Sequence, residues 1–183
     1  RGFAYHDGIY KTDGEVSMAG LSISSEIFKP YTNYVFSFKI RKTSGNIETI
    51  GGHAGLFTGD SRTEVDGTVY TNIHFTRGVP YPNDDLVHVV RVYGRTGTLS
   101  IVDPNLYIQP NRGSEGSYSN KTYSAEIWDI QVEEGTVASQ YTPTLEEQAA
   151  QSQAFALEAA KPANERITLW EHAGTTYING GQI

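Results

Sequence analysis

The sequence predicts an all-β fold: a two-sheet jelly-roll sandwich, followed by one connector helix and a C-terminal β-hairpin. The first observation is compositional, because 12 Tyr, 7 Phe and 19 Gly accompany a single Met among 183 residues. This bias is typical of strands joined by tight turns. The second is periodic: roughly eight short stretches of alternating apolar residues precede Pro143, separated by Gly, Asn and Asp. Their spacing, with no amphipathic helix between them, favours a sandwich.

The clearest predicted strand is Tyr34–Arg41, in which every second residue is apolar. A period of two marks a strand with one face in the core. The residues expected in the core on this ground are Tyr34, Phe36, Phe38 and Ile40, together with Trp128, Ile130 and Val132 from the last strand. The other predicted strands are residues 16–23, 46–50, 68–75, 86–93, 98–102, 105–109 and 123–132, with turns that include Thr43-Ser44-Gly45 and Asp66-Gly67.

The chain changes in character after Pro143, which predicts the end of a first domain over residues 1–143. Thr144 and Glu147 match a capping box, and good helix formers follow, so residues 144–162 are predicted as a connector helix. Small residues recur on it at heptad spacing: Leu145, Ala149, Ser152, Ala156 and Ala159. A helix packed on its own sandwich and a helix paired with partner chains both fit this pattern. Residues 163–183 predict a β-hairpin that turns at Ala173-Gly174.

Charge and composition exclude several classes of protein. The formal net charge is -7, with no basic stripe, which argues against a nucleic-acid partner. No apolar run approaches the roughly 20 residues of a membrane-spanning helix, and no signal peptide is visible. The absence of cysteine excludes disulfides, thiolate zinc sites and a Cys nucleophile. A start at Arg1 rather than Met suggests an excised or processed piece.

No enzyme, cofactor or metal site is predicted. The sequence lacks the motifs of serine hydrolases, zinc proteases and P-loop proteins. Its five histidines show no metal-ligand spacing. A structural calcium ion is the one alternative, with oxygen ligands from Asn83-Asp84-Asp85 or from Asp60, Glu64 and Asp66. Acidic loops of this kind are more often simply solvated.

The stretch from Ala125 to Thr144 carries a resemblance to a known family. A strand at Ile127–Val132 is followed by Glu133-Glu134-Gly135, a small-residue spacer and Tyr141-Thr142-Pro143. This order resembles the closing segment of carbohydrate-binding-module-like domains in bacteriophage tail fibres, baseplate proteins and tail-tip proteins. Tyr34–Arg41 with Ser44-Gly45 is similar to an early strand of the same family. Tyr177–Ile183 resembles a segment common in the central fibres of long-tailed phages.

The resemblance implies a galactose-binding-like jelly roll in a virion tail, outside the cell when it acts. The implied function is binding of a host cell-surface saccharide during adsorption. The implied partners are that glycan, other tail or baseplate proteins and, in the full-length protein, two further copies in a homotrimer. The C-terminal hairpin would then begin a further fibre segment. The alternative is a structural spacer or decoration domain of the fibre that binds no saccharide.

The candidate saccharide site lies in residues 70–81. Sugars are recognised by an aromatic ring face flanked by planar hydrogen-bonding groups. As a strand, residues 70–77 would place Tyr70, Asn72 and His74 on one face, with Arg77 at its end. Prolines on both sides of Tyr81 are expected to hold its ring outward for stacking, while Asn72 and His74 bond the hydroxyls. A solvated sheet face followed by an ordinary Pro-rich turn is the other interpretation.

Overall fold

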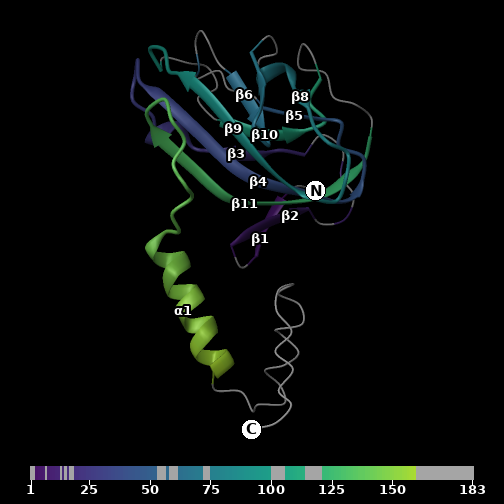
Figure 1. The fold of residues 1–183 in the computed structure, drawn as a ribbon, viewed down its shortest axis with the longest axis vertical. Coiled ribbons are helices and arrows are strands. Elements are labelled where there is room, and N and C mark those ends of the chain that lie inside the picture. The colour runs from purple at the N-terminus through teal and green to yellow at the C-terminus, as the bar shows by residue number, and fades with distance from the viewer. Residues whose placement is uncertain are drawn as a thin grey trace. The chain divides into compact units, whose positions relative to one another are not determined.

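The computed structural model describes residues 3–6, 8–12, 14, 16, 19–52, 57, 62–71, 75–99, 106–113 and 121–159. The chain divides into two compact units, Arg1–Tyr141 and Thr142–Ile183. The described part of the first unit consists of β-strands and two short 3-10 helices (Figure 1). In chain order they are β1 (Phe3–His6), β2 (Ile9–Thr12), β3 (Leu21–Ile23), η1 (Ser25–Ile27), β4 (Asn33–Gly45), β5 (Thr49–Gly51), β6 (Arg62–Val65), β7 (Thr68–Tyr70), η2 (Phe75–Arg77), β8 (Val79–Pro80), β9 (Val87–Arg95), β10 (Leu106–Pro110) and β11 (Tyr123–Glu134).

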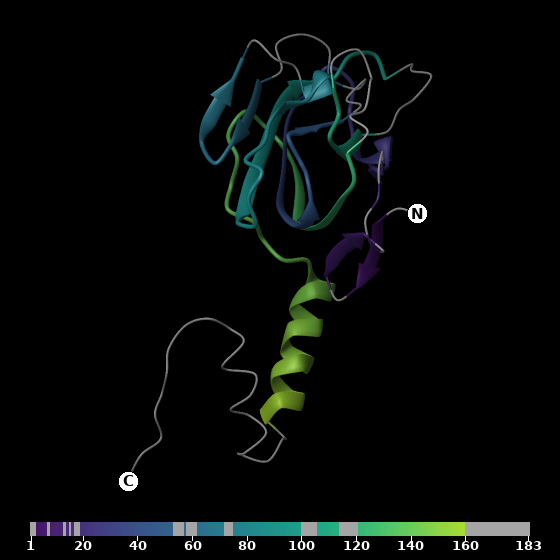
Figure 2. The same ribbon diagram turned by 90° about the vertical axis from the view of Figure 1, so that its right-hand side faces the viewer.

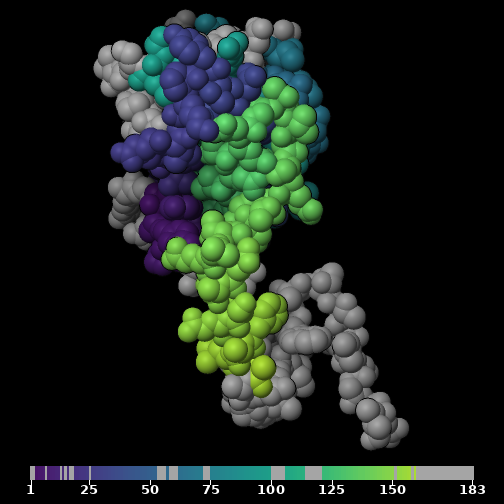
Figure 3. All heavy atoms as spheres, turned by 90° about the vertical axis from the view of Figure 1, so that its left-hand side faces the viewer, coloured from purple at the N-terminus to yellow at the C-terminus, as the bar shows by residue number. Residues whose placement is uncertain are grey.

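The strands form two antiparallel sheets, which confirms the predicted all-β, two-sheet class. The larger sheet has seven strands in the order β1-β2-β11-β4-β9-β6-β7, and the smaller has four in the order β3-β10-β5-β8. Figure 2 shows the strands around a common interior. The strand β4 pairs with β11 on one side and with β9 on the other along most of its length. In Figure 3 the purple N-terminal hairpin lies beside the green residues that include β11, as the pairing of β2 with β11 requires.

The hydrophobic core lies between the two sheets. The inner side chains of β4 are 0 to 2% exposed, as the alternation predicts: Tyr34, Phe36, Phe38 and Ile40. They pack in one cluster with Ile50, Leu106 and Ile108 from the smaller sheet. Full burial of one such side chain contributes about 1.5–3 kcal/mol, so this cluster is the main favourable term in folding.

Trp128 does not lie in the core, contrary to the prediction. Before the bulge, the buried residues of β11 are Tyr123, Ala125 and Ile127, so Trp128 points to the opposite side of the sheet, where it is half-buried. The pairing then shifts between Trp128 and Gln131, where Asp129 has φ 50 and one extra residue enters the strand. This β-bulge reverses the alternation. Ile130 and Val132, which follow it, do pack against the core, as expected.

The predicted strand over residues 68–75 is confirmed only at its start, and residues 72–74 lie outside the described residues. The strand β7 ends at Tyr70, and Phe75–Arg77 form a turn of 3-10 helix with Phe75 buried. Strands β1, β2, β6 and β8 were not predicted, because they are two to four residues long and too short to show a period. The predicted turn at Asp66-Gly67 is confirmed, with φ values of 49 and 81. Of the predicted strand 98–102, Thr98 and Leu99 lie outside any strand, and the rest lies beyond the described residues.

The helix α1 spans Leu145–Ala159 in the second unit. Its predicted capping box is confirmed, because Glu147 N donates to Thr144 Oγ1 (3.2 Å) and Thr144 N donates to Glu147 Oε2 (2.7 Å). No helix in the described ranges is long and apolar enough to cross a membrane. The predicted hairpin over 163–183 lies outside the described residues.

Two buried threonines provide a test of the sandwich interior. Thr63 Oγ1 has no hydrogen-bond partner among the described residues, whereas Thr96 Oγ1 donates to Lys29 O (2.6 Å) and accepts from Thr32 N (2.9 Å). We expect Thr63→Val to raise the free energy of unfolding by about 1 kcal/mol, because it removes an unsatisfied hydroxyl, and Thr96→Val to lower it by about 1–3 kcal/mol. Denaturant unfolding of both variants measures this. A loss of stability in Thr63→Val would contradict the assignment.

Candidate functional site

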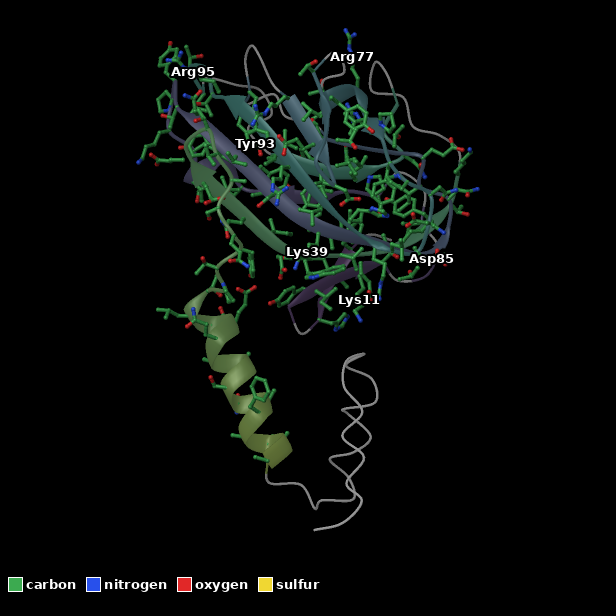
Figure 4. The ribbon with its side chains drawn as sticks, in the orientation of Figure 1. Lys11, Lys39, Arg77, Asp85, Tyr93 and Arg95 are labelled. Atoms are coloured by element: carbon green, nitrogen blue, oxygen red, sulfur yellow. The ribbon has the colours of Figure 1, made fainter. Side chains whose placement is uncertain are left out.

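The described residues of the predicted saccharide site do not form an exposed row. Tyr70 pairs in register with Thr63, an inner-face residue, and packs against the core. Arg77 is exposed on η2 and points away from the body of the sandwich (Figure 4). Asn72 and His74 lie outside the described residues. Tyr70 is therefore a half-buried residue on the inner face and not part of a solvent-facing polar strand.

Tyr81 is buried, and the prediction that its flanking prolines hold it outward is wrong. Its side chain is 5% exposed and belongs to the core cluster. The hydroxyl donates to Ile40 O at 3.4 Å, and the ring meets His88 edge-on at 4.9 Å. Burial raises the pKa of Tyr81 well above its usual value, with a smaller contribution from the charges of Asp84 and Asp66. The ring therefore fills the interior and cannot stack on a sugar.

The residues that follow Tyr81 attach the same loop to the sandwich. Asn83 Oδ1 accepts from Ile47 N (3.1 Å), and Asn83 Nδ2 donates to Asn46 Oδ1 (2.6 Å). Lys42, which is 9% exposed, reaches Asp85 at 2.7 Å. A loop held in this way by its own side chains is a structural closure of the sandwich, and those side chains are not available for a ligand.

His88 ties this loop to the turn between β6 and β7. Its side chain is 5% exposed and lies between two carboxylates, with Nδ1 2.5 Å from Asp66 Oδ2 and Nε2 2.7 Å from Asp84 Oδ1. Carboxylate oxygens on both sides are acceptors, so the arrangement favours the imidazolium form of His88, in which both ring nitrogens carry a proton. We call Asp66, His88 and Asp84 the histidine clamp. Sequence reasoning missed it because Asp66 is distant along the chain.

The clamp shifts the pKa values of His88 and Asp84. Burial alone would lower the pKa of His88, but the hydrogen bonds and charges of Asp66 and Asp84 outweigh it, and the pKa rises above its usual 6.5. The hydrogen bond from His88 lowers the pKa of Asp84, and Leu86 N adds to this effect. His88 therefore keeps its proton to higher pH than a free imidazole does.

The calcium alternative receives no support from the geometry of the described residues. Asp84 and Asp85 pair with different cations, His88 and Lys42, and do not converge. Within the described ranges no group of three or more His, Asp or Glu side chains could hold a metal ion. Asp60, from the second candidate set, lies outside those ranges.

The remaining candidate surface is the outer face of the seven-stranded sheet, the side that points away from the core. Register and alternation place polar and aromatic side chains there on three neighbouring strands: Ser37 and Lys39 from β4, Arg91 and Tyr93 from β9, and Arg62 and Glu64 from β6. Figure 4 shows Lys39 and Tyr93 along these strands. Extended strands hold such side chains at fixed spacing, so this surface is preformed.

Tyr93 is at the centre of a small polar cluster on the outer face. The Arg62 guanidinium lies 4.0 Å from the centre of the Tyr93 ring, in a cation–π contact. The Tyr93 hydroxyl donates to Glu64 Oε2 at 3.0 Å, and Arg62 lies 3.5 Å from Glu64 Oε1. Burial raises the pKa of Tyr93 above its usual value, so the phenol stays protonated at neutral pH.

Trp128 contributes a second aromatic side chain to the outer face, because it precedes the bulge and lies opposite Lys39 in register. Lys39 in turn pairs with Asp129 at 2.7 Å. Beyond the bulge, Gln131 donates to Ser139 Oγ (3.0 Å) and Glu133 accepts from Ser139 N (3.1 Å), so the chain after β11 folds back beside this face. The sequence signal for this surface was the alternation of β9, in which Arg91 and Tyr93 occupy the outward positions.

The histidine clamp predicts how stability depends on pH. Because the pKa of His88 is raised in the folded state, its contribution is complete below pH 6.5 and is lost as pH rises through the folded-state pKa. We expect the melting temperature to fall over that range in the wild type. His88→Asn should melt lower at about pH 6 and should lack this fall, whereas His6→Asn, on an exposed side chain of β1, should follow the wild type. Circular dichroism melts between about pH 5 and 9 measure this. Parallel pH profiles for wild type and His88→Asn would refute the clamp.

Comparisons with known proteins show few similarities. No protein-family model matches the chain, and no curated protein matches it. Among solved structures, the chain is similar to one from the tripod of the baseplate of bacteriophage Tuc2009, with 15% sequence identity and a TM-score of 0.40. The similarity covers 76% of this chain and 51% of the other, so this chain spans about half the length of that protein. A likeness of this extent supports no inference about function.

Proposed function

We propose that the chain is a module of a bacteriophage tail that binds a host cell-surface saccharide during adsorption. The observation that carries the proposal is the closing motif of residues 125–144. In the structure this motif begins with β11, the strand between β2 and β4. Gly135, with φ 135, then turns the chain, and its N donates to Asn33 O at 2.8 Å. Classification of the sandwich as a galactose-binding-like jelly roll is part of the same proposal.

The outer face suits a saccharide better than the 70–81 segment does. A sugar ring needs an aromatic surface for its C–H side and planar polar groups for its hydroxyls. Trp128 and Tyr93 are half-buried there, with Gln131, Ser37 and Arg91 between them in register. In the 70–81 segment, Tyr81 is buried and Tyr70 is half-buried against the core. We therefore place the saccharide on the outer face.

Binding to purified bacterial surface polysaccharides on an array tests this proposal. The protein is displayed on a multivalent carrier, because one shallow site binds weakly and several copies gain avidity. We expect Trp128→Ala and Tyr93→Ala to reduce binding several-fold. The matched control is Tyr5→Ala, since Tyr5 is 56% exposed but lies in register with Tyr10 and hence with Ile127, an inner-face residue. Thermal melting checks that each variant folds.

Two results would count against the proposal. If the wild type binds no polysaccharide on the array and no bacterial cell, the spacer function becomes the better account. If the wild type binds but the Trp128 and Tyr93 variants bind equally well, the saccharide lies elsewhere on the molecule.

The same proposal includes assembly with other tail proteins and a homotrimer in the full-length protein. The large apolar side chains of α1 are exposed: Leu145 at 84%, Phe155 at 75% and Leu157 at 69%. A single helix of this length is marginal in water without a partner. We expect the second unit to supply the contacts between copies, with α1 acting as the connector.

Light scattering on the 183-residue chain and on a chain that ends at Pro143 tests this assembly. We expect a higher mass per particle for the longer chain, because only that chain carries α1 and the residues after it. The boundary at Pro143 lies close to the division between the two compact units, so the shorter chain keeps the whole sandwich. Equal numbers of copies in both samples would show that the second unit does not drive association.

A further inference from the structure

The charged side chains of the outer face largely neutralise one another. Lys39 pairs with Asp129 at 2.7 Å, and Arg41 pairs with Glu126 at 2.5 Å. Lys11 also reaches Glu126, at 3.0 Å. Pairs of this kind at a surface add little stability, but they give each of these three cations a carboxylate partner.

Arg91 is the exception among the described cations of this face. It is half-buried on the central part of β9, in register with Ser37 on one side and Glu64 on the other. Glu64 would be its natural partner across the strands. However, Glu64 Oε2 accepts from the Tyr93 hydroxyl, and Glu64 Oε1 is the atom nearest to Arg62. Within the described ranges the Arg91 guanidinium therefore has no carboxylate bound to it.

Arg91 is half-buried as a residue and has no carboxylate partner among the described residues, so its guanidinium is available to pair with an oxyanion. Its planar fork of N–H donors matches the two oxygens of a carboxylate or phosphate. The position also suits a sugar that carries such a group. Ser37 and, beyond it, Gln131 continue the same row across β4 and β11, and Tyr93 and Trp128 lie in the rows on either side.

We propose that Arg91 makes this module selective for acidic saccharides. The guanidinium pairs with a carboxylate or phosphate on the sugar, and the neighbouring polar side chains on the row bond its hydroxyls. This inference rests on the proposed saccharide-binding function and identifies the chemical class of the ligand. It also explains why a chain of net charge -7 keeps an unpaired cation on this face.

The first experiment compares an oligogalacturonate with its fully methyl-esterified form, in which each carboxylate is replaced by a neutral ester. NMR titration follows the Nε–Hε signals of the arginine side chains, and calorimetry gives Kd. We expect the acid to bind at least roughly tenfold more tightly than the ester and to shift the Arg91 signal. A phosphorylated oligomannose and unmodified oligomannose form a second pair, which distinguishes phosphate from carboxylate as the preferred group.

Variants of Arg91 complete the test. Arg91→Ala should bind acid and ester equally, and Arg91→Lys should keep only part of the preference, because lysine retains the charge without the fork. Arg77→Ala is the matched control, since it removes an exposed arginine on η2, outside the sheet. Thermal melting confirms folding in each case.

The outcomes separate this inference from the proposed function. Binding of polysaccharides with no preference for acid over ester, unchanged in Arg91→Ala, overturns the role of Arg91 and leaves the proposed function standing. An Arg91 signal that shifts only with the acidic probes, in a protein that binds no bacterial cell or surface polysaccharide, supports the anion site and refutes the proposed function. An Arg91 signal that no acidic probe shifts overturns the inference.

Discussion

The pairing of β4 on both of its edges is the constraint on which the rest of the structure depends. Nine residues of β4 are matched in register with β9, and the same strand pairs along its length with β11. Because side chains alternate on a strand, this one backbone separates two environments. In β4 the side chains at even-numbered positions from Tyr34 to Ile40 form one side of the core, whereas Ser37 and Lys39 face outward. The core and the candidate binding surface thus lie on opposite faces of the same hydrogen-bonded strands.

The strands that could be predicted are those long enough to show their period. Tyr34–Arg41 was predictable because four apolar residues alternate without interruption, and the structure extends that strand only at its ends. The capping box at Thr144 and Glu147 was predictable because its signal is local. Trp128 was not, because the bulge at Asp129 changes the phase of the strand, and a left-handed Asp has no reliable signature in a single sequence.

The candidate site was the least predictable part. A tyrosine between two prolines indicates a rigid turn, but it does not say whether the ring points outward or into the core. Tyr81 fills the core because His88, Asn83 and Asp85 hold its loop against the sandwich, and the partners of these residues lie elsewhere in the chain. Arg91 and Tyr93 could be predicted to face outward from the alternation of polar and apolar residues along their strand. Their environment depends on Glu64 and Arg62, which belong to a strand too short to be predicted.

The position of β11 also determines when the molecule can fold. This strand is the last of the first unit in the sequence, yet it lies between β2 and β4 in the sheet. During synthesis the N-terminal hairpin therefore has no neighbour among the described strands until Glu126 and Ile127 have been added to the chain. Contacts that span so much of the sequence are slow to form, and an incomplete chain exposes the unpaired edge of β4. Until β11 has been synthesised, the unpaired edge of β4 can bind other polypeptide chains. The strand that begins the closing motif therefore also protects the nascent chain from aggregation.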